Sequence, residues 1–172
     1  MQFSKLVVAM VLGFGATVAV ANDVKDGFYV GGSVGAFGMT GAAGDEEGSS
    51  TAYGLNAGYQ KYIDTRTSLF FDLAYTKTNT SVNDKFLVPS VLVGYDFTLS
   101  NGKRLTPKVG VGMYKSYFDT NAGEKDGNTG VALKVGIDYE FTKNTYVGLM
   151  HTHIDAAETN GRITTLTLTK KF

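Results

Sequence analysis

The stretch "VALKVGIDYEF", residues 131–141, decides the fold. One set of alternate positions is apolar throughout, and it consists of Val131, Leu133, Val135, Ile137, Tyr139 and Phe141. The intervening set is small or charged, and it consists of Ala132, Lys134, Gly136, Asp138 and Glu140. Successive side chains of a β-strand point to opposite faces, whereas a helix would mix the two sets. The stretch therefore predicts a strand that separates an apolar environment from a polar one.

The same alternation recurs along the chain and predicts eight strands. Their ranges are 27–37, 52–62, 67–78, 85–99, 104–117, 130–142, 145–154 and 162–172. The connections alternate in length, with long polar ones at 38–50, 79–85, 119–129 and 155–161 and short ones at 64–67, 100–103 and 143–144. Asn101-Gly102 in a short connection is a strong hairpin signal. We therefore expect an all-β, eight-stranded antiparallel up-and-down barrel with both chain ends beside the short turns.

The first 21 residues have the pattern of a secretory signal peptide. Lys5 is followed by an apolar run and then by the small-x-small sequence Ala19-Val20-Ala21. The run is shorter than the roughly 20 residues of a membrane-spanning anchor, which is the alternative. We predict a cleaved signal peptide at 1–21 and a barrel domain at 22–172.

Charge and cysteine content exclude some classes of function. The chain has 16 basic and 16 acidic residues, so without Lys5 the balance is 15 against 16, a net charge of −1. A nucleic-acid partner is therefore not expected, because such proteins carry a basic excess. With no cysteine, an exported chain must be stabilised by backbone pairing and packing.

Barrels occur in two polarities, and three features favour the membrane type over a soluble, lipocalin-like one. The polar face is mostly Gly, Ser, Thr and Asn, whereas a soluble exterior would carry many charges. Aromatic residues of the apolar face gather near the short turns, as in a membrane-interface girdle; they are Phe28, Tyr59, Tyr95, Phe97, Tyr139, Phe141 and Phe172. Long connections lie at one end only, as in outer-membrane barrels. We therefore expect an apolar outside and a polar, packed lumen.

Several motifs resemble a known family. The chain ends in "TLTLTKKF" (165–172), in which Leu166, Leu168 and Phe172 share the apolar face. This ending is similar to the signal that outer-membrane barrels present to the barrel-assembly machinery. "GFYVGGSVG", "VLVGYDF" and "LTPKVGVGMY" resemble the opacity and outer-membrane-protein-A type of small eight-stranded barrels. The resemblance implies a monomer in the outer membrane of a Gram-negative bacterium, with periplasmic termini and extracellular loops that act in adhesion or host interaction.

Seven charged residues fall on the predicted luminal face: Asp72, Asp96, Lys108, Lys134, Asp138, Glu140 and Lys171. An eight-stranded barrel is just wide enough for side chains to fill. Because buried charges need partners, we expect a luminal ion-pair network, with Tyr29, Phe70, Tyr114 and Tyr146 packed over glycines. The alternative is a proton or ion path, which would make the protein a narrow pore.

"HTHID" holds both histidines of the chain. His151, His153 and Asp155 would share one strand face, which makes them candidate metal ligands if Glu158 joins them. Alternatively, the histidines are polar aromatic residues at the outer interface. The sequence does not decide which face of this strand points toward lipid, because Tyr146, Met150 and Ile154 on the opposite face are also candidates for the lipid side. A lipid-A-modifying enzyme is a further alternative, although it needs a hydroxyl nucleophile beside a histidine. We expect no cofactor and no enzymatic activity.

Lys77, Lys115 and Arg162 lie on the predicted lipid-facing side at the long-connection ends of their strands. Such a basic rim would pair with phosphates of lipopolysaccharide in the outer leaflet. The alternative is that these side chains simply extend to the interface. The expected partners are therefore outer-membrane lipid, lipopolysaccharide, the assembly machinery and a ligand of the loops. A soluble periplasmic ligand-binding barrel remains a rival interpretation of the whole chain.

Overall fold

The computed structural model describes residues 26–41, 46–79, 85–120, 123–155 and 159–172, so the predicted signal peptide lies outside the described residues. All assigned elements in these ranges are strands. They are β1 (Gly27–Gly41), β2 (Glu46–Tyr62), β3 (Thr67–Thr78), β4 (Lys85–Tyr95), β5 (Phe97–Thr98), β6 (Arg104–Thr120), β7 (Gly123–Thr142), β8 (Thr145–Asp155) and β9 (Thr159–Lys171). Within this described part of the chain, no helix is long and apolar enough to cross a membrane.

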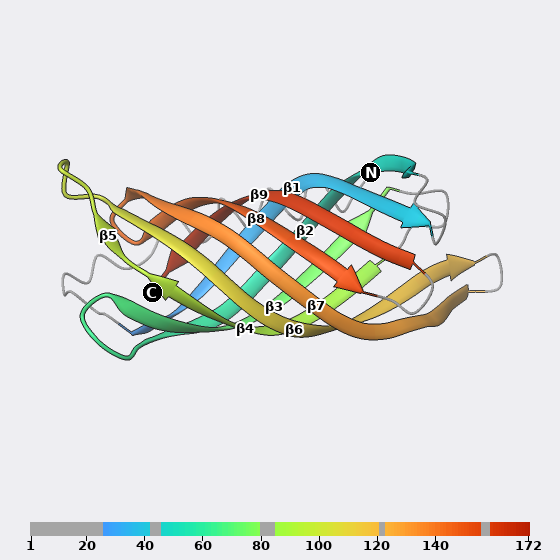
Figure 1. Ribbon diagram of the computed structural model, residues 1–172, viewed down its shortest axis with the longest axis horizontal. Coiled ribbons are helices and arrows are strands. Elements are labelled where there is room, and N and C mark those ends of the chain that lie inside the picture. Colours follow the sequence, from blue (N-terminus) through green and yellow to red (C-terminus); the bar gives the residue numbers. More distant parts are fainter. Residues whose placement is uncertain (1–25, 42–45, 80–84, 121–122, 156–158) are drawn as a thin grey trace.

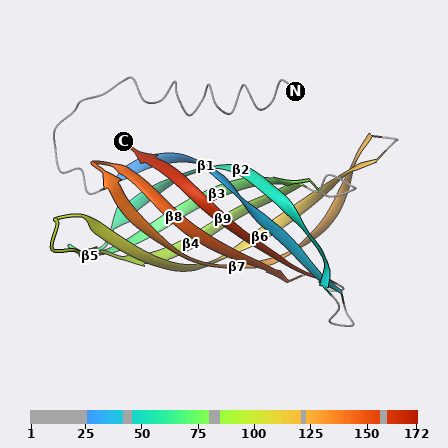
Figure 2. The ribbon, with the colours of Figure 1, turned by 90° about the horizontal axis from the view of Figure 1, so that it is seen from above.

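The strands close into a barrel. Each strand pairs antiparallel with its neighbour in the order β4-β3-β2-β1-β9-β8-β7-β6, and β4 pairs with β6 to complete the circle. The short β5 continues β4 along β6, so β4 and β5 together count as one of eight barrel strands. Figures 1 and 2 show the strands tilted around the barrel axis. The predicted eight-stranded antiparallel barrel is confirmed.

Several boundary predictions were wrong. The predicted strand 85–99 is interrupted at Asp96, whose backbone amide bonds to Arg66 O (2.8 Å) in place of a ladder partner. The predicted loops 38–50 and 119–129 are largely strand, because β1 and β2 stay paired to Thr40↔Glu46 and β6 and β7 to Thr120↔Gly123. Backbone pairing in a hairpin does not require apolar alternation, which is why the sequence pattern stopped earlier. The β6–β7 hairpin extends beyond the barrel in both views (Figures 1 and 2).

The barrel has two different ends and an apolar outer wall. The turns after β2, β5 and β7 lie at the end with Phe172, which we call the turn end; the other is the loop end. Large exposed hydrophobic side chains cover the outer wall between them, including Leu73, Val91, Val109, Val111, Met113, Val131, Leu133, Leu149, Leu166 and Leu168. A continuous exposed apolar surface of this extent marks contact with lipid. The aromatic residues predicted for the girdle lie on this wall at the turn end, where Phe28 packs on Tyr59 and Tyr95 on Phe97.

Candidate functional site

The middle of the lumen holds two ion pairs. Lys134 Nζ on β7 lies 2.5 Å from Asp72 Oδ2 on β3, and both side chains are buried. Tyr29 donates a hydrogen bond to Asp72 Oδ1 (2.8 Å). Lys108 Nζ lies 2.5 Å from Asp138 Oδ2 on the neighbouring strand. Each of these four luminal charges therefore has a partner of opposite sign, as removal from water requires.

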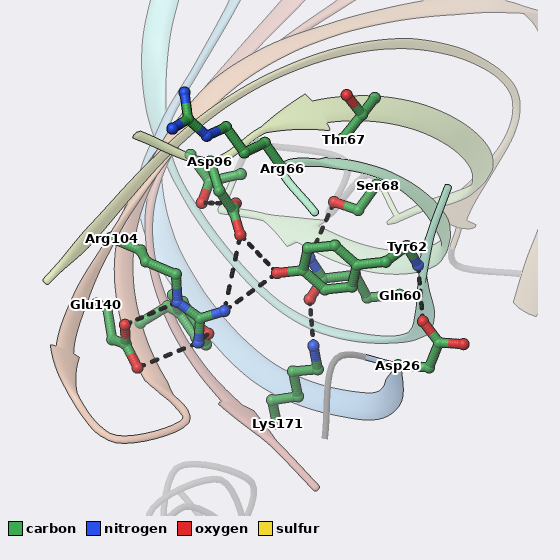
Figure 3. A network of polar contacts seen from close by, with 12 residues as sticks. Asp26, Gln60, Tyr62, Arg66, Thr67, Ser68, Asp96, Arg104, Glu140 and Lys171 are labelled. Carbon is green, nitrogen blue, oxygen red and sulfur yellow. Dashed lines mark hydrogen bonds and ion pairs between the residues drawn. The ribbon is translucent and has the colours of Figure 1, made fainter. Parts of the chain in front are cut away.

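A second network, centred on Arg104, fills the lumen at the turn end (Figure 3). The guanidinium binds Glu140 through two atoms, with Nε 2.9 Å from Oε2 and Nη2 3.3 Å from Oε1. It also donates to the Tyr62 hydroxyl (3.1 Å) and the Tyr146 hydroxyl (2.7 Å). Tyr62 in turn donates to Asp96 Oδ2 (2.5 Å), which lies 3.7 Å from Arg104 Nη1. A planar guanidinium suits this multiple contact better than an ammonium would.

All seven charged residues predicted for the lumen lie inside it, whereas Arg104 was not predicted. They form separate groups in which Lys134 binds Asp72, Lys108 binds Asp138, and Glu140 and Asp96 surround Arg104. Lys171 donates to Gln60 Oε1 (2.8 Å). Arg104 is four positions before Lys108 on the same strand, so the alternation places both side chains on the luminal face. The residue was overlooked because it begins its strand, directly after the turn at Asn101-Gly102.

An apolar layer closes the lumen toward the loop end. Its buried members are Phe37, Ala52, Phe86, Val88, Tyr114, Ala132, Ile154 and Ile163. Glycines make room for the rings: a Cβ on Gly94 would lie 2.6 Å from the Phe70 ring and one on Gly130 2.7 Å from the Tyr114 ring. Along the luminal wall a cavity of about 70 Å³ remains, which is room for a few water molecules. Side chains thus fill most of the described lumen.

The end of the chain is tied into the outer wall at the turn end. Leu166, Leu168 and Phe172 are exposed on the lipid-facing side of the last strand. The Phe172 amide donates to Phe28 O (2.8 Å), so the last residue closes the ladder between β9 and β1. This position agrees with a strand-borne assembly signal, whose recognition stays a prediction.

The tertiary structure separates the predicted arginine of the basic rim from its two predicted lysines. Lys77 on β3 and Lys115 on β6 lie on either side of β4, on the outer wall at the loop end. Lys85 of β4 lies between them and was not predicted. Arg162 is also exposed on the outer wall at this end, but it is on β9, with β1 and β2 between it and Lys77.

The histidines face outward. Tyr146, Thr152 and Ile154 are buried in the lumen, which leaves His151 and His153 on the outer wall. In the described ranges, no three His, Cys, Asp or Glu side chains are close enough together to hold a metal ion, and Glu158 lies outside those ranges. His151 Nδ1 instead lies 2.8 Å from Thr164 Oγ1 on β9. This hydroxyl was missed because it lies 13 residues away in sequence.

The turn after β2 is organised by Asp64, outside the lipid-facing wall. Its carboxylate accepts hydrogen bonds from the backbone amides of Arg66 (2.7 Å) and Thr67 (2.8 Å). These bonds stabilise the ionised form and hold the pKa of the Asp64 carboxyl below its ordinary value. The side chain thereby fixes the short connection that sets the β2–β3 register.

Comparison with known proteins agrees with the barrel described above. The family described as Outer membrane protein beta-barrel domain matches residues 6–172. A search of curated proteins finds no match.

Solved structures with the same fold include three small membrane barrels. Neisserial surface protein A (NspA) aligns with a TM-score of 0.63 and 16% identity, covering 84% of this chain and 97% of its own. The outer membrane enzyme PagL aligns with a TM-score of 0.64 and 16% identity, covering 84% of this chain and 99% of its own. Ail, the attachment invasion locus protein of Yersinia pestis, aligns with a TM-score of 0.56 and 14% identity, covering 86% of this chain and 97% of its own. At these identities the likeness concerns the fold. Together with the family match, it shows that the chain belongs to the outer membrane protein β-barrel domain family and is a β-barrel of the bacterial outer membrane.

Proposed function

We propose that this protein is a non-conducting, non-enzymatic barrel that displays its loop-end hairpins on the cell surface for binding. The filled lumen carries this proposal. Two ion pairs, the Arg104 network and the apolar layer occupy the space that a channel would need. Because the filled lumen disfavours transport, a specific role is expected in the loop-end segments that lie beyond the membrane.

The β6–β7 hairpin is the leading candidate for that surface. Its strands stay paired to Thr120↔Gly123, so it is a continuous extension of the barrel wall. Its outer part carries Asp119, Glu124 and Asp126 against a single Lys125. An acidic hairpin favours a partner with a basic surface over a sulfated polysaccharide. The names of two structural neighbours, a surface protein and an attachment invasion locus protein, support a role at the surface.

Two measurements on the folded barrel test the proposal. In planar bilayers we expect no discrete conductance, and a reproducible single-channel current would overturn the closed-lumen argument. In nanodiscs we expect binding to the basic probe lysozyme and none to heparin. Neutralising the hairpin with D119N, E124Q and D126N should weaken lysozyme binding. The matched change D45N, E46Q and E47Q, at and just before the start of β2, should weaken it less. Equal effects would reject the hairpin as the binding surface.

The contact between His151 and Thr164 favours a second candidate function, lipid ester hydrolysis. His151 would take the proton of Thr164, whose Oγ1 would attack the ester carbonyl and release the alcohol; water would then release the fatty acid. The pair lies on the outer wall, where lipid is the available substrate, and PagL shows that this fold can carry an enzyme. The test is acyl release from purified lipid A. Release that is lost in both T164V and H151Q would establish this function and reject a purely binding role.

A further inference from the structure

Three lysines lie side by side on the outer wall at the loop end. Lys77 of β3 and Lys85 of β4 are direct register partners. Lys85 is also opposite Tyr117 of β6, and Lys115 is two residues along that strand, opposite Leu87. Directly opposed side chains have Cβ atoms about 5 Å apart and diagonal ones about 7–8 Å apart. Three flexible ammonium groups can therefore reach one anion.

The depth of this cluster is set by β4. The strand has 11 residues, from Lys85 at the loop end to Tyr95 in the aromatic girdle. At a rise of about 3.3 Å per residue and a tilt of about 45°, it crosses roughly 25 Å, which is the height of the apolar band of an outer-membrane barrel. The lysines are therefore at the level of the lipid headgroups on the loop side.

An apolar hollow begins directly below the lysines. It has a volume of about 540 Å³, and the upper part of its lining includes Tyr75 and Leu87, which are register partners. Leu87 is itself opposite Lys115. Further along the wall the hollow runs over Gly32 and Ala57, whose small size leaves the space. A cationic cluster thus adjoins an apolar groove of the size of a ligand site.

We propose that this wall binds a phosphorylated lipid of the loop-side leaflet, with its phosphate among Lys77, Lys85 and Lys115 and an acyl chain in the hollow. A phosphate among the three ammonium groups would accept charge-assisted hydrogen bonds from them. The apolar hollow selects a lipid over free phosphate. Arg162 is not part of this site, because it lies on the other side of β1 and β2. The proposal is independent of the hairpin ligand.

Native mass spectrometry of the folded barrel with added lipid tests the site. The probes are diphosphorylated lipid A, the same lipid without phosphates, and inorganic phosphate. We expect retention of one diphosphorylated lipid, at least about tenfold weaker binding in K77Q/K85Q/K115Q, and weaker binding in high salt. The matched control K61Q/K103Q/K143Q removes three lysines at the turn end, and R162Q removes the distant cation. Equal losses in these controls, or equal binding of phosphate-free lipid, would reject the site.

The hollow is tested separately. Ala57→Leu fills it, whereas Ala36→Leu adds the same volume to another exposed position of the outer wall. We expect only Ala57→Leu to weaken lipid retention. Displacement of the lipid by an equal concentration of inorganic phosphate would overturn the assignment to a lipid. Heat-dependent gel mobility verifies that each variant is folded, and K85Q alone replaces the triple variant if the latter fails to fold.

Discussion

Lys134 and Asp72 form an ion pair between strands that are not neighbours. Their charged atoms are 2.5 Å apart, and their side chains are only 4% and 7% exposed. Lys134 also donates to Ser90 Oγ (3.2 Å) on β4. The pair joins β7 to β3 across the lumen, in addition to the backbone ladder that closes the wall. It is therefore both a filler of the lumen and a tie between opposite parts of the barrel.

Removing the cation of this pair should destabilise the barrel strongly. In Lys134→Met the Asp72 carboxylate stays buried without its partner, which costs about 3–5 kcal/mol. Urea unfolding in lipid vesicles, followed by the gel shift between folded and unfolded forms, measures the loss. Lys143→Met in an exposed turn is the matched control and should be nearly neutral. The double variant K134M/D72L should recover most of the stability, and a loss equal to that of K134M would contradict the ion-pair explanation.

Arg104 should not be replaceable by lysine. Arg104→Lys keeps the charge but loses the two-atom contact with Glu140 and the bonds to both tyrosine hydroxyls, so we expect a loss of about 1–3 kcal/mol. Arg104→Gln should lose more, because it leaves two carboxylates without a cation. The same urea assay orders the variants. If Arg104→Lys were as stable as the wild type, the network would depend on charge alone.

The turn at Asp64 should make stability depend on acidity. Because the folded-state pKa of this carboxyl is below its ordinary value of 3.8, its contribution is present above that pH. The contribution is lost as the pH falls through the folded-state pKa. The difference in urea midpoint between wild type and Asp64→Ala should therefore shrink as the pH is lowered from 6 toward 2. A difference that stays constant over this range would show that the carboxylate charge is not involved.

Phe172 should matter for assembly more than for stability. Phe172→Ala should lower the amount of folded barrel in the outer membrane of cells, while refolding of the pure protein into detergent should be little changed. Phe141→Ala is the matched control, because it removes another exposed phenylalanine of the girdle, away from the chain end. Heat-dependent gel mobility of membrane fractions measures the folded amount. Equal losses for the two variants would reject a specific assembly signal at the terminus.

Much of the fold could be predicted because strand periodicity is local. In residues 131–141 the alternation alone assigned each side chain to the lumen or the outer wall, and the structure places Lys134 and Asp138 inside as that pattern requires. Boundaries were less predictable. The hairpin around Thr120 and Gly123 continues by backbone pairing, and the break at Asp96 depends on a bond to Arg66 in a different turn.

The sequence by itself determined the strand type, the polarity of the two faces and the distinct ends of the barrel, because these follow from side-chain period and connection length. Only the tertiary structure decided which residues meet. Lys134 and Asp72 are 62 positions apart, and Lys77, Lys85 and Lys115 come from three strands. Such neighbours are set by the register of each strand pair and by the closure between β4 and β6. Closure is a property of the whole sheet, so no local pattern encodes it.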